Sequence, residues 1–277
     1  MTTSSYRQFF GLQNEPFTAD VKRKDILVTS ALKGVEERIH YALRIGGIAV
    51  VTGEIGSGKS TALRYVIGGL HTSEHRIIYI TASGGSILEL YRQILGELGV
   101  GLSSSSRALM TQRIKQEITE LTKGKKMKAA LVIDEASLLR LEVFAELHTL
   151  TQFEQDSKPF LPIVLAGQSN LVDNLRYRNS LPLASRVIAK THLQGCDQKT
   201  MEEYLRHHLS IAGMQRMLFD EAAVTAIHQG SGGLFRKANH LARGALVAAA
   251  RSESQEVTAE HVRLAATELI LTDGRVL

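Results

Sequence analysis

Eight consecutive residues combine three glycines with a lysine and two serines, a pattern suited to binding phosphate. They run Gly53-Glu54-Ile55-Gly56-Ser57-Gly58-Lys59-Ser60, and Thr61 follows. Glycines let the backbone curl so that successive N–H groups converge on an anion, and a helix starting at the loop adds its positive end. We expect Lys59 to reach the β- and γ-phosphates of ATP and the Ser60 hydroxyl to bind Mg²⁺. All nine residues are therefore predicted to contact the nucleotide, and we call Gly53–Ser60 the P-loop.

The flanking sequence distinguishes this loop from a chance glycine-rich turn, which is the alternative. An apolar, β-branched run over residues 48–52 predicts a buried strand before the loop. Residues 61–67 predict a helix after it. A phosphate-binding loop requires this strand–loop–helix context.

An apolar run that ends in two acids, residues 129–135, lies downstream of the P-loop. Such a run is typical of a buried parallel strand that ends at a nucleotide site. We expect Asp134 to hold Mg²⁺ through water and Glu135 to orient and polarise the attacking water. Adjacent strand residues point to opposite faces, so both acids can line one crevice only if the chain turns at the end of the strand.

Polar residues follow the next expected strand, residues 162–166, as Gly167-Gln168-Ser169-Asn170. Gln168 is the favoured partner for the γ-phosphate or the attacking water. Ser169 and Asn170 suit a turn and a helix cap equally well.

Three arginines lie within residues 176–186, before a fifth expected strand over 187–192. Arginine suits the stabilisation of phosphoryl-transfer charge from a neighbouring subunit, and solvated surface arginines are the alternative. Arg236 stands just inside a helix that follows a glycine cluster, where it could fold back onto the phosphates.

Strands alternate with helices up to residue 195, which predicts an α/β fold with a five-stranded parallel sheet flanked by helices. One of these helices is expected over 137–154. Beyond Gly195, helical periodicity over 199–212, 220–229, 234–250 and 258–270 predicts an all-helical lid domain. The predicted organisation is an N-terminal arm over 1–28, a nucleotide-binding domain over 29–195, the lid over 196–271 and a tail over 272–277. Phe17 belongs to the arm, which we expect to be pinned to the core and also to wall the adenine pocket.

Composition narrows the class of protein. The 277 residues carry a net charge of +5, which permits an acidic partner, but aromatic residues make up only 5% and Trp is absent, which disfavours binding by base stacking. One cysteine, Cys196, excludes a disulfide scaffold and a cysteine-rich zinc site. The sequence shows neither a signal-peptide apolar region nor a run of about 18 apolar residues, so no membrane span is expected and the protein is predicted to be cytoplasmic.

Three further stretches carry a family resemblance. They are Phe9-Phe10-Gly11-Leu12 with Pro16-Phe17, Leu165-Ala166-Gly167-Gln168, and Ser231-Gly232-Gly233-Leu234-Phe235-Arg236-Lys237-Ala238-Asn239. With the P-loop and the acidic strand, they make the chain resemble AAA+ ATPases from about Tyr6 to Ile270. More narrowly, it resembles the ExeA-like branch, which includes secretion ATPases and is related to transposition ATPases of the TnsC, TniB and IstB type. That branch commonly has a proline where Phe235 stands.

The resemblance implies specific roles and an assembly. Gln168 matches the sensor-1 position and Arg236 the sensor-2 position. Arg186 matches an arginine finger, with Arg178 in reserve. A homo-oligomer, either a ring or a helical filament with ATP at the subunit interfaces, is implied as well.

The resemblance also leads to a functional expectation. ExeA-type secretion ATPases continue into a membrane span and a cell-wall-binding segment, whereas this chain stops after the lid, as transposition helpers do. We therefore expect an ATP-dependent DNA-transposition helper that assembles on double-stranded DNA and recruits a transposase. A secretion or protein-assembly ATPase without DNA function is the competing class, and a nucleotide-gated switch that barely hydrolyses ATP is a third.

Lysine and arginine contacts to phosphates would supply most of such DNA binding. The candidates are Arg107, Arg113, Lys115 and, in the basic turn 123–128, Lys125. The alternative, which is the usual explanation of a basic run, is a solvated surface.

Overall fold

The computed structural model describes residues 4–101 and 105–267, and their contacts form two compact units. The sheet unit contains residues 30–54 and 59–193. Of the described residues, the helical unit contains 4–29, 55–58 and 194–267. The predicted tail over 272–277 and the last residues of the helix predicted over 258–270 lie outside the described residues.

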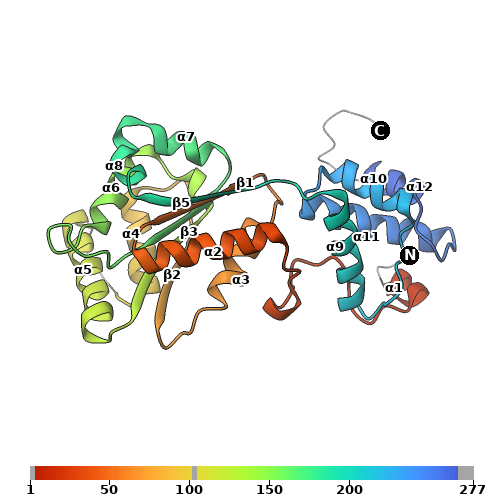
Figure 1. The fold of residues 1–277 in the computed structure, drawn as a ribbon, viewed down its shortest axis with the longest axis horizontal. Helices are drawn as coiled ribbons and strands as arrows, with labels where there is room; N and C mark the ends of the chain where they lie inside the picture. The colour runs from red at the N-terminus through yellow and green to blue at the C-terminus, as the bar shows by residue number, and fades with distance from the viewer. Residues whose placement is uncertain (1–3, 102–104, 268–277) are drawn as a thin grey trace. The chain divides into compact units, whose positions relative to one another are not determined.

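A five-stranded parallel sheet in the order β2-β3-β4-β1-β5 forms the centre of the sheet unit (Figure 1). The strands are β1 (Ile48–Gly53), β2 (His75–Thr81), β3 (Lys128–Asp134), β4 (Ile163–Gly167) and β5 (Val187–Leu193). Every neighbouring pair is parallel, which confirms the predicted α/β sheet. The inner strands are near-continuous apolar runs because helices cover both faces of a parallel sheet.

Alternate strand residues reach two different layers of helices. Val50, Ile133 and Leu165 lie in the large core that α4–α8 complete. Their sequence neighbours point to the opposite face, along which α2 and α3 contact the strands. The helices are α2 (Ser30–Ile45), α3 (Lys59–Ile67), α4 (Ile87–Glu97), α5 (Arg107–Thr119), α6 (Leu141–Thr151), α7 (Asn170–Arg176) and α8 (Leu181–Ala184), with helical turns η2 (Glu120–Gly124), η3 (Ala136–Leu138) and η4 (Arg178–Ser180).

The helix predicted over 137–154 is wrong at both ends. Glu135 adopts a left-handed φ of 54°, and the short turn η3 follows it. The helix α6 starts only at Leu141 and ends at Thr151. Leu138, which a helix over 137–154 would place on its apolar face with Leu141 and Phe144, is 50% exposed. The periodicity was misleading because a backbone reversal, not a helix start, follows β3.

The helical unit has a small apolar core of its own. Its elements are α1 (Ser4–Phe10), η1 (Arg23–Asp25), α9 (Gln198–Ile211), α10 (Glu221–Ser231), α11 (Phe235–Arg251) and α12 (Ala259–Thr267). Asp197 and Asp220 cap α9 and α10, since each carboxylate accepts a backbone N–H from the first turn. Across residues 4–101 and 105–267, no helix is both long and apolar enough to cross a membrane.

The N-terminal segment packs into this core, as expected for an arm that is pinned to it. Tyr6, Phe10 and Phe17 all belong to the buried cluster. The Phe17 ring stacks on His208 with a centroid distance of 5.5 Å, and only 1% of the residue is exposed. Burial, with a smaller contribution from the neighbouring His207, lowers the pKa of His208 to about 4.

We predict that the stability of the helical unit depends on pH through His208. In the unfolded chain this histidine binds a proton near pH 6.5, whereas in the folded chain it resists protonation down to about pH 4. Above about pH 6.5 the histidine is neutral in both states, and the free energy of unfolding does not depend on its titration. As the pH falls from 6.5 towards 4, the unfolded chain binds a proton that the folded chain excludes, so the free energy of unfolding falls by up to about 3 kcal/mol. Hydrogen exchange of the α9 amides in urea, corrected for intrinsic rates, measures this loss.

The variant His208→Phe should flatten this pH dependence because it removes the buried titrating group. The matched control is His40→Phe, which changes an exposed histidine of α2 and should leave the dependence in place. An unchanged pH profile in His208→Phe would contradict the prediction.

Candidate active site

The P-loop connects β1 to α3, and the side chain of its lysine, Lys59, folds back onto the loop. Gly56 and Gly58 have φ values of 85° and 97°, which side-chain-bearing residues rarely adopt. Lys59, only 6% exposed, begins α3, and its Nζ donates to the carbonyls of Gly53 and Glu54 at 2.9 Å each. The side chain is thus fixed against the loop by two hydrogen bonds.

One polar atom of the loop fits a phosphate directly. The Ser57 Oγ is buried with no hydrogen-bond partner among the described residues. A buried hydroxyl without a partner is costly unless a ligand satisfies it. Together with the positive-φ glycines and the buried lysine, it makes the loop a fitting cradle for a phosphate chain. Ser60 and Thr61 follow at the exposed start of α3.

Both acids stand at the end of β3. Asp134 is its last residue and is 4% exposed. Its Oδ1 accepts the Glu135 backbone N–H at 2.9 Å, and its Oδ2 accepts the Tyr79 hydroxyl at 2.9 Å. The left-handed Glu135, which is half-buried, turns the chain directly after Asp134. This turn removes the strict alternation that would place the two acids on opposite faces.

Strand register brings the P-loop, the acids and Gln168 to one edge of the sheet. Ile133 pairs with Leu165, and Leu165 pairs with Val50, so these three form one row across β3, β4 and β1. Asp134 lies one row further towards the carboxyl edge, and Gly53 lies three rows further. The strands are about 5 Å apart, so Asp134 is two strand spacings, or about 10 Å, from β1.

Gln168 follows β4 at this same edge. It is half-exposed, and its backbone N–H donates to the Ser137 Oγ at 3.2 Å. Ser169 occupies the N-cap position of α7, but its side chain makes no cap hydrogen bond. A Cβ on Gly167 would lie 2.8 Å from the Ser137 nitrogen, so only glycine allows η3 to approach the end of β4 this closely.

Arg186 lies at the opposite edge. Its carbonyl accepts the Ile48 N–H at 3.0 Å, at the start of β1. The five steps from Ile48 to Gly53 span about 16 Å, so Arg186 and the P-loop of the same chain lie at opposite ends of β1. Its Nη2 bonds both Asp156 carboxylate oxygens at 2.5 and 2.6 Å, and its Nε bonds His148. Burial lowers the pKa of His148, and the Arg186 charge lowers it further.

The other two arginines of interest differ in their surroundings. Arg178, in η4, is exposed. Arg236 is the second residue of α11, and its backbone N–H donates to the Gly56 carbonyl at 3.3 Å within the helical unit. The ring of Phe235, before it, packs against Tyr204 at 4.6 Å.

Most of the predicted DNA contacts already have acceptors within the chain. Arg107 pairs with Glu146 at 2.8 Å, and Arg113 pairs with Glu117 at 2.7 Å. Lys115 donates to the Gln152 carbonyl at 2.9 Å, and burial lowers its pKa. Lys125 is exposed.

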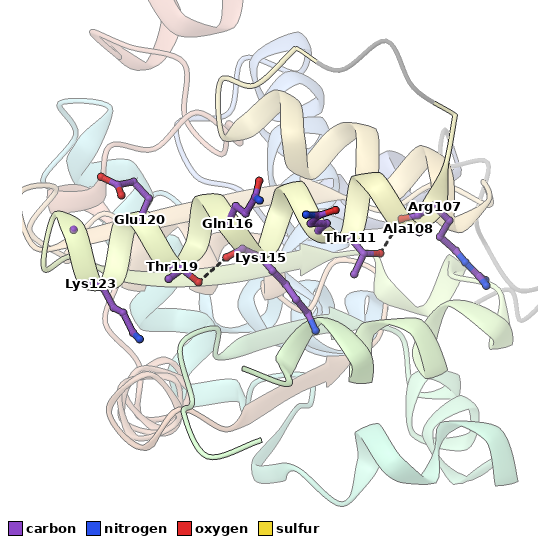
Figure 2. A pocket seen from close by; sticks show the side chains of 10 residues that line it. Arg107, Ala108, Thr111, Lys115, Gln116, Thr119, Glu120 and Lys123 are labelled. Carbon is purple, nitrogen blue, oxygen red and sulfur yellow. Dashed lines mark hydrogen bonds between the residues drawn. The ribbon is translucent and has the colours of Figure 1, made fainter. Parts of the chain in front are cut away.

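One side of α5 and η2 lines a groove of about 800 Å³. Arg107, Lys115 and Lys123 extend from this side of the helix (Figure 2). Lys123 also has a partner, the carboxylate of Glu154. In this groove Arg107 and Lys123 are therefore paired with acids of the same chain, and Lys115 is bonded to a backbone carbonyl.

Tyr79 is a site residue that the sequence analysis missed. Its signal was a hydroxyl among the three isoleucines of β2. Its contact to Asp134 depends on the β2–β3 register, which no local pattern reveals.

Comparison with known proteins agrees with this geometry. Residues 44–175 match the family model of the AAA domain. The chain has the fold of Cdc6p from Pyrobaculum aerophilum, with a TM-score of 0.68 at 16% identity over 96% of this chain and 71% of that one. The chain has an AAA+ fold. An AAA+ domain implies ATP binding, typically with Mg²⁺.

Two further proteins are similar to this chain, one in sequence and one in fold. General secretion pathway protein A of Aeromonas hydrophila is 31% identical over 267 residues, which cover 95% of this chain and 48% of that protein. This chain thus spans about half the length of that relative. The Aeropyrum pernix ORC1 protein, solved in complex with DNA, has a TM-score of 0.67 at 20% identity, covering 91% of this chain and 68% of that one.

We predict that Gly167→Ala destabilises the AAA+ protein by about 2 kcal/mol, because the new Cβ forces Ser137 and η3 away from β4. Hydrolysis should fall with it, since Gln168 follows directly. The control is Gly96→Ala in α4, where a Cβ meets nothing within 4 Å. There alanine should be neutral or stabilising, since it favours helix. Urea unfolding compares the two variants, and equal stabilities would contradict the prediction.

Proposed function

We propose that the chain is an ExeA-type AAA+ ATPase that uses ATP to drive the assembly of proteins in a secretion pathway. The observation that carries this proposal is the secretion-pathway relative, which matches 95% of the chain at 31% identity. The P-loop and the acidic pair supply the residues that such an ATPase needs.

The proposed mechanism divides ATP hydrolysis among residues at the carboxyl edge. Lys59 and the P-loop backbone bind the phosphates, and Ser60 and Asp134 hold the metal and its water. A Mg²⁺ ion held there would supply positive charge that offsets the charge developing on the phosphates. Glu135 orients the attacking water and accepts its proton.

The remaining roles follow the family resemblance. Gln168 contacts the γ-phosphate as sensor 1, and Arg236 acts as sensor 2. Phe17 contributes to the adenine pocket through the arm. Arg186, or Arg178 in its place, acts on the site of a neighbouring subunit, because Arg186 lies at the far end of β1 from its own P-loop. The active form is therefore a homo-oligomer.

The DNA-transposition helper expected from the sequence is the second candidate. Lys125, Lys126 and Lys128 are exposed, and the net charge of the chain is +5. ORC1, which shares the fold, was solved with DNA. However, the relative that matches nearly the whole chain is named for secretion, and Arg107, Arg113 and Lys115 have acceptors within the chain. We therefore favour the secretion ATPase over a helper that recruits a transposase.

The two candidates predict different responses to DNA. Light scattering should show ATP-dependent assembly that needs no DNA, and Lys59→Ala should abolish it. Fluorescence anisotropy with random duplex DNA at low and high salt should show no ATP-dependent binding. Tight binding that weakens steeply with salt, as phosphate contacts require, would instead favour the transposition helper.

We predict that two inactive variants restore each other's ATPase activity. Glu135→Gln lacks the base and Arg186→Ala lacks the arginine, so each alone should lose at least about a thousandfold in turnover. In a one-to-one mixture, about a quarter of interfaces combine an intact base with an intact arginine, so that share of activity should return in mixed oligomers.

Two controls separate a role across the interface from a structural one. Asp156→Asn weakens the ion pair of Arg186 but keeps the arginine, so activity should persist. Arg176→Ala removes an exposed arginine of the same segment and should also leave activity near normal. If Arg178 acts instead, only Arg178→Ala will complement Glu135→Gln. No recovery with either arginine variant would refute the shared site.

A further inference from the structure

Tyr79 lies beside the acidic end of β3, on the face of the sheet that α2 and α3 cover. Its neighbours Ile78 and Ile80 belong to the core on the other face, so alternation places the tyrosine opposite them. Tyr79 pairs with Val132 in β3, and Asp134 stands two residues further on the same face. Such a diagonal neighbour is within reach of an aromatic side chain.

The hydroxyl of Tyr79 uses this position to hold the carboxylate of Asp134. It donates to Oδ2 at 2.9 Å, while the Glu135 N–H donates to Oδ1 at 2.9 Å. The two donors come from different elements, the strand β2 and the turn after β3. Together they fix the rotation of the carboxylate, yet a carboxylate offers about four lone-pair sites, so about two remain for other donors.

The hydroxyl is suited to this role because an ionised carboxylate only accepts hydrogen bonds and the tyrosine supplies the donor. Outer partners of this kind orient the groups that hold a metal, and their removal typically weakens metal binding about 10- to 100-fold.

We propose that Tyr79 is a positioning residue that orients Asp134 towards the hydrated Mg²⁺ of the nucleotide complex. The proposal rests on the proposed ATPase function, in which Asp134 holds the metal through water. It assigns Tyr79 no contact with the nucleotide. Its loss should therefore weaken the response to Mg²⁺ and spare the binding of metal-free nucleotide.

The test compares Tyr79→Phe with wild type in the binding of a fluorescent ATP analogue. Phenylalanine keeps the ring and removes only the donor. We expect equal affinity in EDTA, and about tenfold more Mg²⁺ for the half-maximal metal effect in the variant. The matched control is Tyr41→Phe, which removes a hydroxyl from an exposed tyrosine of α2 and should shift nothing.

A double-variant comparison separates positioning from general support of the fold. Asp134→Asn should itself weaken the Mg²⁺ response, and adding Tyr79→Phe should then weaken it little further, because the hydroxyl acts through the carboxylate. A shift of full size in the Asp134→Asn background would overturn the proposal. So would an unchanged or improved Mg²⁺ response in Tyr79→Phe, or an equal loss of affinity in EDTA.

Failure of the proposed function has a different signature. If wild-type affinity is insensitive to both Mg²⁺ and Lys59→Ala, the ATPase assignment falls and this proposal falls with it. If wild type responds to both and Tyr79→Phe behaves like wild type, only the role of Tyr79 is refuted.

Discussion

The parallel pairing of β1, β3 and β4 is the constraint on which the site depends. Parallel strands end at the same edge of a sheet, so three segments separated along the chain deliver the P-loop, Asp134 with Glu135, and Gln168 to one place. Helices on both faces make this arrangement rigid, since an exposed parallel sheet would leave its apolar faces in water. The ends of the strands therefore position the candidate site residues, without long flexible loops.

The same pairing separates Arg186 from the P-loop of its own chain. A residue just before β5 lies at the amino edge, next to Ile48, and the length of β1 then lies between the arginine and the phosphates. Asp156 and His148 satisfy its guanidinium within the subunit. Asp156 itself follows Glu154 and Gln155 in a run of three left-handed residues, a conformation costly for residues other than glycine. The backbone of the loop that contains Asp156, the partner of Arg186, is thus strained at three consecutive residues.

Sequence reasoning failed where long-range contacts overrule local patterns. The helix expected over 137–154 was shortened because the close packing of Ser137 on Gly167 shapes the start of that segment. The basic character of α5 was correctly noted, but the acids opposite it, Glu146 and Glu154, are distant in sequence and could not be assigned as partners. Tyr79 was missed for the same reason, since it meets an aspartate 55 residues away.

The sequence by itself determined the P-loop, the acidic strand end and the α/β class, because glycine spacing and apolar runs act over a few residues. It also marked the break between the alternating strands and helices and the helical segments beyond Gly195. Only the tertiary structure decided which charged residues share an edge, which already have partners, and how Asp134 is held. Those features depend on strand register and on side chains that meet across the fold, and neither is encoded in any short stretch of chain.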